Sequence, residues 1–261
     1  MSASEVVPGC SFLDPSRLSW QIVHVLCFAL GGFTFIIGTL CYFDFLQAYD
    51  LGAWLYIIGS CGFLGVDVLE LATYYKLDKY LTINICLSVT GSTLYILGSI
   101  GFLPSMDTDG STSALGIWGF ILGSFFIGTS QLWKVLRIGG SSEELDQEKI
   151  DPLSHYANLI NEDEDDRETL DNYNIVEEKT NIFTAFRWSN LFRNEDNRSA
   201  FGVEFSACLG GWFFFFGTIM DDIGTPSGAY FTAILIIWTF GSIFFSLGAI
   251  WLAYRHFKLN L

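Results

Sequence analysis

Six apolar stretches separated by short polar breaks dominate the chain. Five of them reach the ~20 residues that a helix needs to cross ~30 Å of hydrocarbon. The sixth is shorter, but Phe201 and Val203 extend it past Glu204, and flanking side chains can reach the interface. We therefore predict an all-α integral membrane protein with six transmembrane helices, over residues 20–43, 51–75, 80–103, 114–133, 205–220 and 229–254.

The basic residues predict how these spans are oriented. Lys and Arg favour the cytoplasmic side of a membrane, and all 13 lie in the connections of one side. The connections of the other side contain neither residue. The sequence therefore predicts that both chain ends lie in the cytosol (N-in/C-in). No small-residue cleavage site follows a basic start near Met1, so we expect the first span to be retained.

Two recurring phrases divide the spans into three pairs. The odd-numbered spans contain GGFTFIIGT from residue 31, GSTLYILGS from residue 91 and GGWFFFFGT from residue 210. The even-numbered spans contain LGAWLYIIGS from residue 51 and LGIWGFILGS from residue 115, with a weaker third copy, WTFGS, from residue 238. We predict three tandem helical hairpins, arranged as parallel repeats about an axis along the membrane normal.

Every predicted span also carries two glycines seven residues apart, which is about two helical turns. Such a pair lies on one stripe of the helix. Because lipid provides no hydrophobic drive between helices, small residues there allow close backbone approach. We favour a packing seam over a ligand groove for these glycines: Gly31, Gly38, Gly52, Gly59, Gly91, Gly98, Gly116, Gly123, Gly210, Gly217, Gly241 and Gly248.

The phrases of the first hairpin, FIIGT followed about twenty residues later by GAWLYIIGS, resemble the YrhK-like membrane domain, a small two-helix module. The resemblance covers the three hairpins and leaves out the long central connection. The third hairpin departs from it, since it lacks the glycine before its tryptophan, Trp238. The resemblance implies a membrane fold of paired helices and no catalytic residue.

The second span holds the most notable polar residues, Asp67 and Glu70, which share one helix face. Charges within a bilayer are costly and often mark ion or proton paths. Counting from Leu51 places Asp67 roughly 24 Å inward, in the inner leaflet. Alignment of the repeats puts Glu70 and Lys134 at one depth. We favour a structural ion pair between the second and fourth spans over a transport role for these three residues.

Each outer connection carries two aspartates, and together these could gather cations or ligate calcium. Acidic residues are also tolerated outside the membrane without a function, and no calcium-loop pattern follows them. We therefore predict no metal site at these positions: Asp44, Asp50, Asp107, Asp109, Asp221 and Asp222.

Enzymatic motifs are missing from the sequence. It has neither an H-E-x-x-H zinc motif nor a Gly-x-Ser-x-Gly nucleophile elbow, and only three histidines. His24 and His256 stand near span ends, where we interpret them as ordinary interfacial histidines. The sequence therefore predicts a protein that is not an enzyme and that binds no cofactor.

The connection from residue 139 to 200 has 16 acidic and 6 basic residues, with an acidic run at 162–166. This composition predicts a solvated, self-repelling linker and excludes nucleic acid as a partner. Docking of a basic cytosolic protein is the alternative. Aromatic residues and arginines alternate over residues 181–193, which we expect to lie along the inner membrane surface.

The resulting domains are a cytosolic N-terminal segment (1–18), hairpin repeat one (19–78), hairpin repeat two (79–138), an acidic cytosolic loop (139–200), hairpin repeat three (201–257) and a C-terminal tail (258–261). We favour a non-enzymatic structural or interaction component of a membrane, with lipid, membrane proteins or a second copy as partners. The alternative is an ion or small-solute channel or transporter that uses Asp67 and Glu70. The plasma membrane, endomembranes and organelles all remain open as its location.

Overall fold

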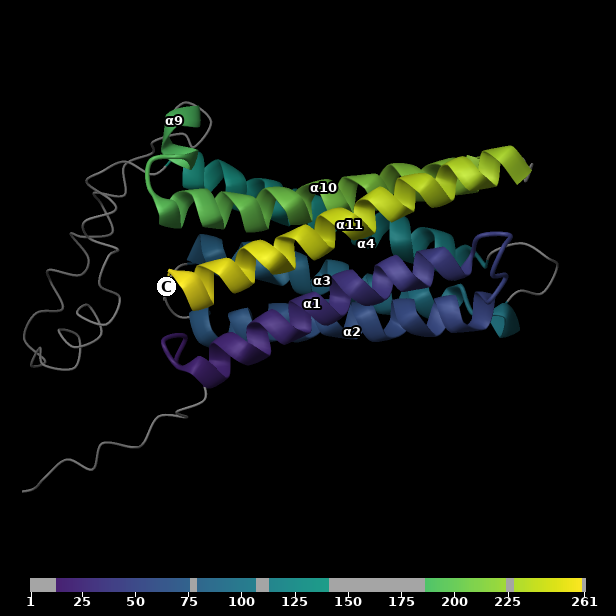
Figure 1. Ribbon diagram of the computed structural model, residues 1–261, viewed down its shortest axis with the longest axis horizontal. Coiled ribbons are helices and arrows are strands. Elements are labelled where there is room, and N and C mark those ends of the chain that lie inside the picture. Colours follow the sequence, from purple (N-terminus) through teal and green to yellow (C-terminus); the bar gives the residue numbers. More distant parts are fainter. Residues whose placement is uncertain (1–12, 76–78, 107–112, 141–185, 224–227, 260–261) are drawn as a thin grey trace, which may run out of the picture.

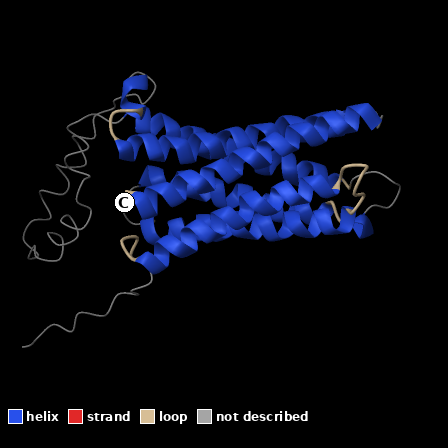
Figure 2. Cartoon of the chain, viewed as in Figure 1, coloured by secondary structure: helices blue, strands red, loops and turns tan. Residues whose placement is uncertain are grey.

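A computed structural model describes residues 13–75, 79–106, 113–140, 186–223 and 228–259. The described residues form α-helices and one short 3-10 turn, with no strand among them (Figures 1 and 2). The six long helices are α1 (Leu18–Cys41), α2 (Tyr49–Tyr74), α3 (Lys79–Gly101), α4 (Ala114–Gly140), α10 (Glu195–Ile223) and α11 (Gly228–Lys258). A single turn of helix, α9 (Trp188–Leu191), precedes α10, and the 3-10 turn η1 (Pro104–Met106) follows α3.

All six long helices are long and apolar enough to cross a membrane, as the hydropathy pattern predicts. Several of their ends extend further than the apolar stretches, most of all in α4 and α10. Helix α4 continues to Gly140, and α10 begins at Glu195. Hydropathy marks only the part of a helix that matches hydrocarbon, whereas the backbone hydrogen bonds continue into the polar boundary.

The start of α10 has its own local cause. The Asn194 side-chain oxygen accepts a hydrogen bond of 2.7 Å from the backbone N–H of Asn197, which is the geometry of an N-cap. Glu195 and Asp196 occupy the first turn, where negative charge is favourable. Residues 195–200 are therefore helical, and their assignment to the acidic loop is wrong. Residues 141–185 of that loop, residues 1–12, and Asp107 and Asp109 lie outside the described residues.

The six long helices close into a ring. Each helix packs against the next in the chain, from α1 through α2, α3, α4 and α10 to α11, and α11 packs against α1. Chain neighbours run antiparallel, so α1 begins and α11 ends at the same end of the bundle (Figure 1). We call this the terminal end, and the opposite one the far end. The first and last helices therefore share the seam that completes the ring.

A tight turn joins α1 to α2 at the far end. The Ala48 N–H donates to the Cys41 carbonyl at 2.9 Å, and Gln47 adopts a positive φ of 49°, which side chains other than glycine seldom adopt. Tyr42, just after α1, is 6% exposed, and its hydroxyl has no hydrogen-bond partner among the described residues. Burial raises the pKa of the Tyr42 phenol well above its ordinary value.

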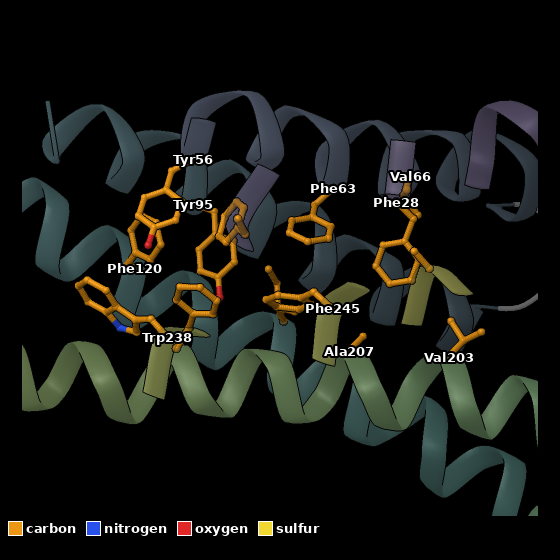
Figure 3. Packing of buried hydrophobic residues seen from close by; sticks show 14 of the residues in the cluster. Phe28, Tyr56, Phe63, Val66, Tyr95, Phe120, Val203, Ala207, Trp238 and Phe245 are labelled. Atoms are coloured by element: carbon orange, nitrogen blue, oxygen red, sulfur yellow. The ribbon is translucent and has the colours of Figure 1, made fainter. Parts of the chain in front are cut away.

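Aromatic side chains fill the interior of the ring (Figure 3). Phe35 of α1 is fully buried, and ring centroids from each of the other five helices lie 4.9–6.3 Å from its own. These neighbours are Tyr56, Phe63, Tyr95, Phe120, Phe214 and Phe245. Such spacing is favourable for aromatic pairs. The centre of the ring is therefore a packed core.

A belt of fully buried hydroxyl groups surrounds this core. Each hydroxyl residue directly follows one of the two heptad-spaced glycines of its helix. Two contacts join different hairpins, Thr39 to Ser242 at 3.3 Å and Ser60 to Ser99 at 3.1 Å. Small side chains let the helices approach, while each hydroxyl finds an acceptor in the apolar interior. The belt consists of Thr39, Ser60, Ser99, Ser124, Thr218 and Ser242.

Helix α9 is fixed to the terminal end of α4. The Arg187 N–H and the Asn190 side-chain amide both donate to the Gly139 carbonyl at 2.9 Å. Leu191 is fully buried, whereas Trp188 and Phe192 are 69% and 57% exposed. An aromatic and basic segment therefore projects from the side of the bundle at this end (Figure 1).

Candidate functional site

A layer of buried polar side chains crosses the bundle near the terminal end. It lies one helical turn beyond the aromatic core, since His24 precedes Phe28 by four residues and Glu70 follows Val66 by four. Five helices supply its ionisable groups, and α3 adds two serines. We call this set the polar layer: His24, Asp67, Glu70, Ser88, Ser92, Lys134, Glu204 and His256.

Lys134 occupies the middle of the polar layer. Its Nζ atom donates to Oε2 of Glu70 at 3.0 Å and lies 3.6 Å from Oε1 of Glu204. The three side chains are only 13–16% exposed. One ammonium group therefore joins carboxylates from α2 and α10, as burial of these charges requires. The structure brings Glu70 and Lys134 together, and it adds Glu204 as a second acid.

Asp67 is held separately from this triad. It is 5% exposed, and the Ser88 and Ser92 hydroxyls of α3 donate to its two carboxylate oxygens, the former at 2.7 Å. Since these hydroxyls satisfy both oxygens, Asp67 is fixed against the neighbouring helix instead of facing an open path. Asp67 and Glu70 thus share a helix face but have different partners.

The two span-end histidines are part of the same layer. His24 is 5% and His256 7% exposed, and Nδ1 of His24 lies 3.1 Å from Nε2 of His256. Nε2 of His24 lies 3.4 Å from Oε1 of Glu70, within ion-pair range but without hydrogen-bond geometry. The Trp20 ring covers both imidazoles, with centroid distances of 4.6 and 5.7 Å. Both histidines therefore point into the bundle and contact each other, whereas their depth in a membrane stays a prediction.

The contact between the two histidines cannot be predicted from the sequence alone, because it forms only when α11 packs against α1. The two residues are 232 positions apart in the sequence. Alignment of the repeats places His24 level with Asn84 and Val203, seven residues before the first glycine of each phrase. That alignment, combined with the depth of Glu70, could have placed His24 in the polar layer. Glu204 lies one residue from this level, and in the sequence it stands only as an interruption beside the apolar run of residues 205–220.

The polar layer does not follow the repeats symmetrically. Lys134 of the second hairpin corresponds to Glu70 of the first, whereas the third hairpin has Leu252 at that position. Likewise, Asp67 corresponds to Gln131 and to Ala249. The third hairpin therefore contributes a largely apolar wall, which Glu204 and His256 interrupt.

The heptad-spaced glycines lie against neighbouring helices. A methyl group on Gly217 would lie 2.6 Å from the Trp238 ring, and one on Gly38 would lie 3.0 Å from the Tyr56 ring. Gly248 faces Phe28 across the seam between α11 and α1. A close backbone contact also involves a glycine outside the predicted set, Gly119, where a methyl group would lie 2.6 Å from the Gly98 Cα atom.

A metal site requires several ligand side chains that are grouped around one point, and not only negative charge. Within the described ranges, no group of three or more His, Cys, Asp or Glu side chains is arranged to hold a metal ion. Asp44, Asp50, Asp221 and Asp222 are among these described residues and form no such group. The polar layer holds its acids on Lys134, on serines and on an imidazole instead.

The six long helices around the shared core have the length and apolar composition of membrane-spanning helices. The family described as YrhK-like protein matches residues 19–73 and 78–137. These segments coincide with the first two hairpins, and the resemblance carried by their shared phrases is confirmed there. Residues 201–257 lie outside the matched segments, so the extension of the likeness to the third hairpin stays a prediction. No curated protein and no solved structure matches the chain.

Proposed function

We propose that this chain is a multipass integral membrane protein with a structural or interaction role, and that it is not an enzyme. The packing of the ring interior carries this proposal. Phe35 contacts aromatic rings from all five other long helices, and the belt hydroxyls around it are fully buried. Such a core favours a rigid body that packs against lipid and membrane partners over a conduit.

The proposed orientation places the terminal end in the cytosol. Arg17, Lys134, Arg137, Arg255 and Lys258 all belong to this end, which supports N-in/C-in by the positive-inside rule. The far end carries acidic residues. Cysteine labelling in intact vesicles provides the test: a single cysteine at the α1–α2 turn should be labelled only from the extracytosolic side.

The proposed domain plan is three tandem hairpins with an acidic cytosolic arm between the second and third. Equivalent residues support it, since Phe35, Tyr95 and Phe214 follow the first glycine of the odd phrases by four residues and all are fully buried. The arm's charge suits a basic cytosolic protein, and it excludes nucleic acid. The bundle itself offers its apolar outer face to lipid, to another membrane protein or to a second copy.

The decisive experiment compares flux with partner capture. Purified protein in liposomes should transport neither protons nor monovalent cations above the rate of empty liposomes. Native purification in lipid nanodiscs should retain a stoichiometric membrane partner or a second copy. Flux that disappears in Asp67→Asn would contradict the structural role, and purification as a lone, partner-free chain would count against the interaction role.

A channel or transporter is the second candidate, and the polar layer is the observation that favours it. Charged side chains from four helices meet within the inner half of the bundle, at depths where such groups often serve ions or protons. Transport by this route requires the aromatic core to move, because the layer lies at one end only. Flux sensitive to both Asp67→Asn and Glu70→Gln is the outcome that distinguishes it.

A further inference from the structure

The two imidazoles of the polar layer face each other across the seam between α1 and α11. Nδ1 of His24 and Nε2 of His256 are 3.1 Å apart, and the ring planes are tilted by 52°. At this separation the two nitrogens hold one proton between them, as an N–H···N hydrogen bond. The opposite nitrogen of His24 points to Glu70 at 3.4 Å.

Counting ring protons gives this pair a limited capacity. A neutral pair carries two ring protons: one ring donates the shared proton, and the accepting ring holds its own proton on the nitrogen that faces away from the gap. One further proton converts a ring to imidazolium and leaves the shared hydrogen bond intact. A second further proton has to enter the facing gap, where two N–H groups and two cations would then oppose each other.

The polar layer around the pair contains more carboxyl groups than ammonium groups. Asp67 and Glu70 approach from α2 and Glu204 from α10, whereas Lys134 of α4 is the ammonium group among them. Three carboxyl groups thus surround one ammonium group, and an imidazolium offsets part of this buried negative charge. The remaining titratable neighbours are Tyr74 of α2, beside Trp20, and Arg255 of α11, which pairs with Asp196 at 2.8 Å; the layer residues of α3 are serines.

Farther along the seam that the pair closes, the described contacts are close packing and a hydroxyl pair. Gly32 lies so close to α11 that a methyl group would be 2.8 Å from the Ser246 Cα atom, and Thr39 contacts Ser242 at 3.3 Å. These contacts hold the middle and the far part of the seam. The histidine pair lies near the terminal end of the same seam.

We propose that His24 and His256 form a proton-binding site with a capacity of one proton, and that uptake of a second proton opens the terminal end of the α1–α11 seam. The site is reached from the terminal end of the bundle. It is independent of whether the protein transports anything, because it concerns proton binding at equilibrium.

Nitrogen-15 NMR of histidine-labelled full-length protein in lipid bilayers tests this directly. His155→Gln removes the third histidine, so every cross-peak between two imidazoles then reports the His24–His256 contact. Ring nitrogen shifts count bound protons as the pH falls from about 8 to about 5. We expect uptake of one proton with the cross-peak retained, and uptake of a second only together with loss of the cross-peak.

A matched variant tests the coupling. In His256→Gln, the amide can still donate to His24, but the shared proton is lost. We expect the proton affinity of His24 to change by roughly tenfold or more, as for strongly coupled sites. Two fully protonated rings with the cross-peak retained would overturn the proposal. An unchanged His24 titration in His256→Gln, or absence of the cross-peak at the upper end of the range, would overturn it equally.

Discussion

The Nζ atom of Lys134 lies 3.0 Å from Oε2 of Glu70, although α2 and α4 are separated by α3 in the ring. This ion pair therefore crosses the interior of the bundle instead of joining two packed neighbours. Glu204 approaches the same ammonium group at 3.6 Å from α10. The Glu70–Lys134 pair thus connects two helices that are not neighbours in the ring.

Removing the central ammonium should be more damaging than removing either acid. Lys134→Met leaves Glu70 and Glu204 buried without their cation, and we expect a loss of roughly 3–5 kcal/mol in the free energy of unfolding. Glu204→Gln should cost less, because Glu70 still pairs with Lys134. Steric trapping in bicelles measures both values, and equal losses would argue against Lys134 as the centre of the layer.

Exchange of the two charges should restore only part of this loss. In Glu70→Lys combined with Lys134→Glu, the ion pair can re-form, but the new carboxylate faces Glu204. Adding Glu204→Gln should then recover further stability. Full recovery without the third substitution would show that Glu204 does not interact with position 134. Fluorescence-detected size exclusion after heating gives the ranking of these variants.

The aromatic core predicts a strong effect at Phe35. Phe35→Ala leaves a cavity among the rings of five helices, and such truncations cost roughly 3–5 kcal/mol. Phe33 is a matched control, since it is 48% exposed on the outer surface of the same helix. Phe33→Ala should change the free energy of unfolding by far less in the same bicelles. Similar losses for both would indicate that the core is not where the stability lies.

Gly119 should tolerate a methyl group poorly. In Gly119→Ala the added methyl meets the Gly98 backbone at 2.6 Å, and backbone atoms cannot move aside as a flexible side chain can. We expect a loss of about 1–3 kcal/mol from overpacking. Gly228→Ala is the control, because nothing lies within 4 Å of its added methyl. Thermal unfolding of both variants in one detergent decides the matter, and a neutral Gly119→Ala would contradict the close approach.

Tyr42 should lower the free energy of unfolding of the protein at alkaline pH. Burial raises the pKa of its phenol in the folded protein, so the unfolded chain ionises first as the pH rises. This contribution to stability is complete below about pH 10 and is lost above it. Tyr42→Phe removes the titration, and it also removes a buried hydroxyl without a partner. We expect a gain of about 1 kcal/mol at neutral pH, and a gap that widens in alkali. Parallel alkaline decline of both proteins would exclude Tyr42 as the cause.

The sequence predicts the helices far better than their contacts. Hydropathy is a local property, so each span is visible in its own residues. The position of Glu70 relative to Lys134 is also visible, because the repeats provide a common depth scale. Neither signal shows which helix closes the ring. His24 and His256 meet only because α11 returns to α1, and their burial follows from that long-range contact.

Glu204 illustrates a second reason for the gap. Within its own span it interrupts an apolar run, and span assignment treats such a residue as a cost. Glu204 forms an ion pair only because the folded bundle places Lys134 beside it. Similarly, the glycine spacing predicts seams but not all of their close contacts, since Gly119 lies outside the heptad pattern and owes its role to Gly98 on the facing helix.

Closure of the ring by its first and last helices has a consequence for synthesis in the cell. Helices enter a membrane in the order in which the ribosome makes them. Glu70 is inserted before Lys134 has been synthesised. His24 can contact His256 only after nearly the whole chain has been translated. Early intermediates therefore hold unpaired polar groups, which insertion machinery or chaperones must shelter. A ribosome that stops before α11 leaves an open ring, and such a truncated product should be recognised and degraded.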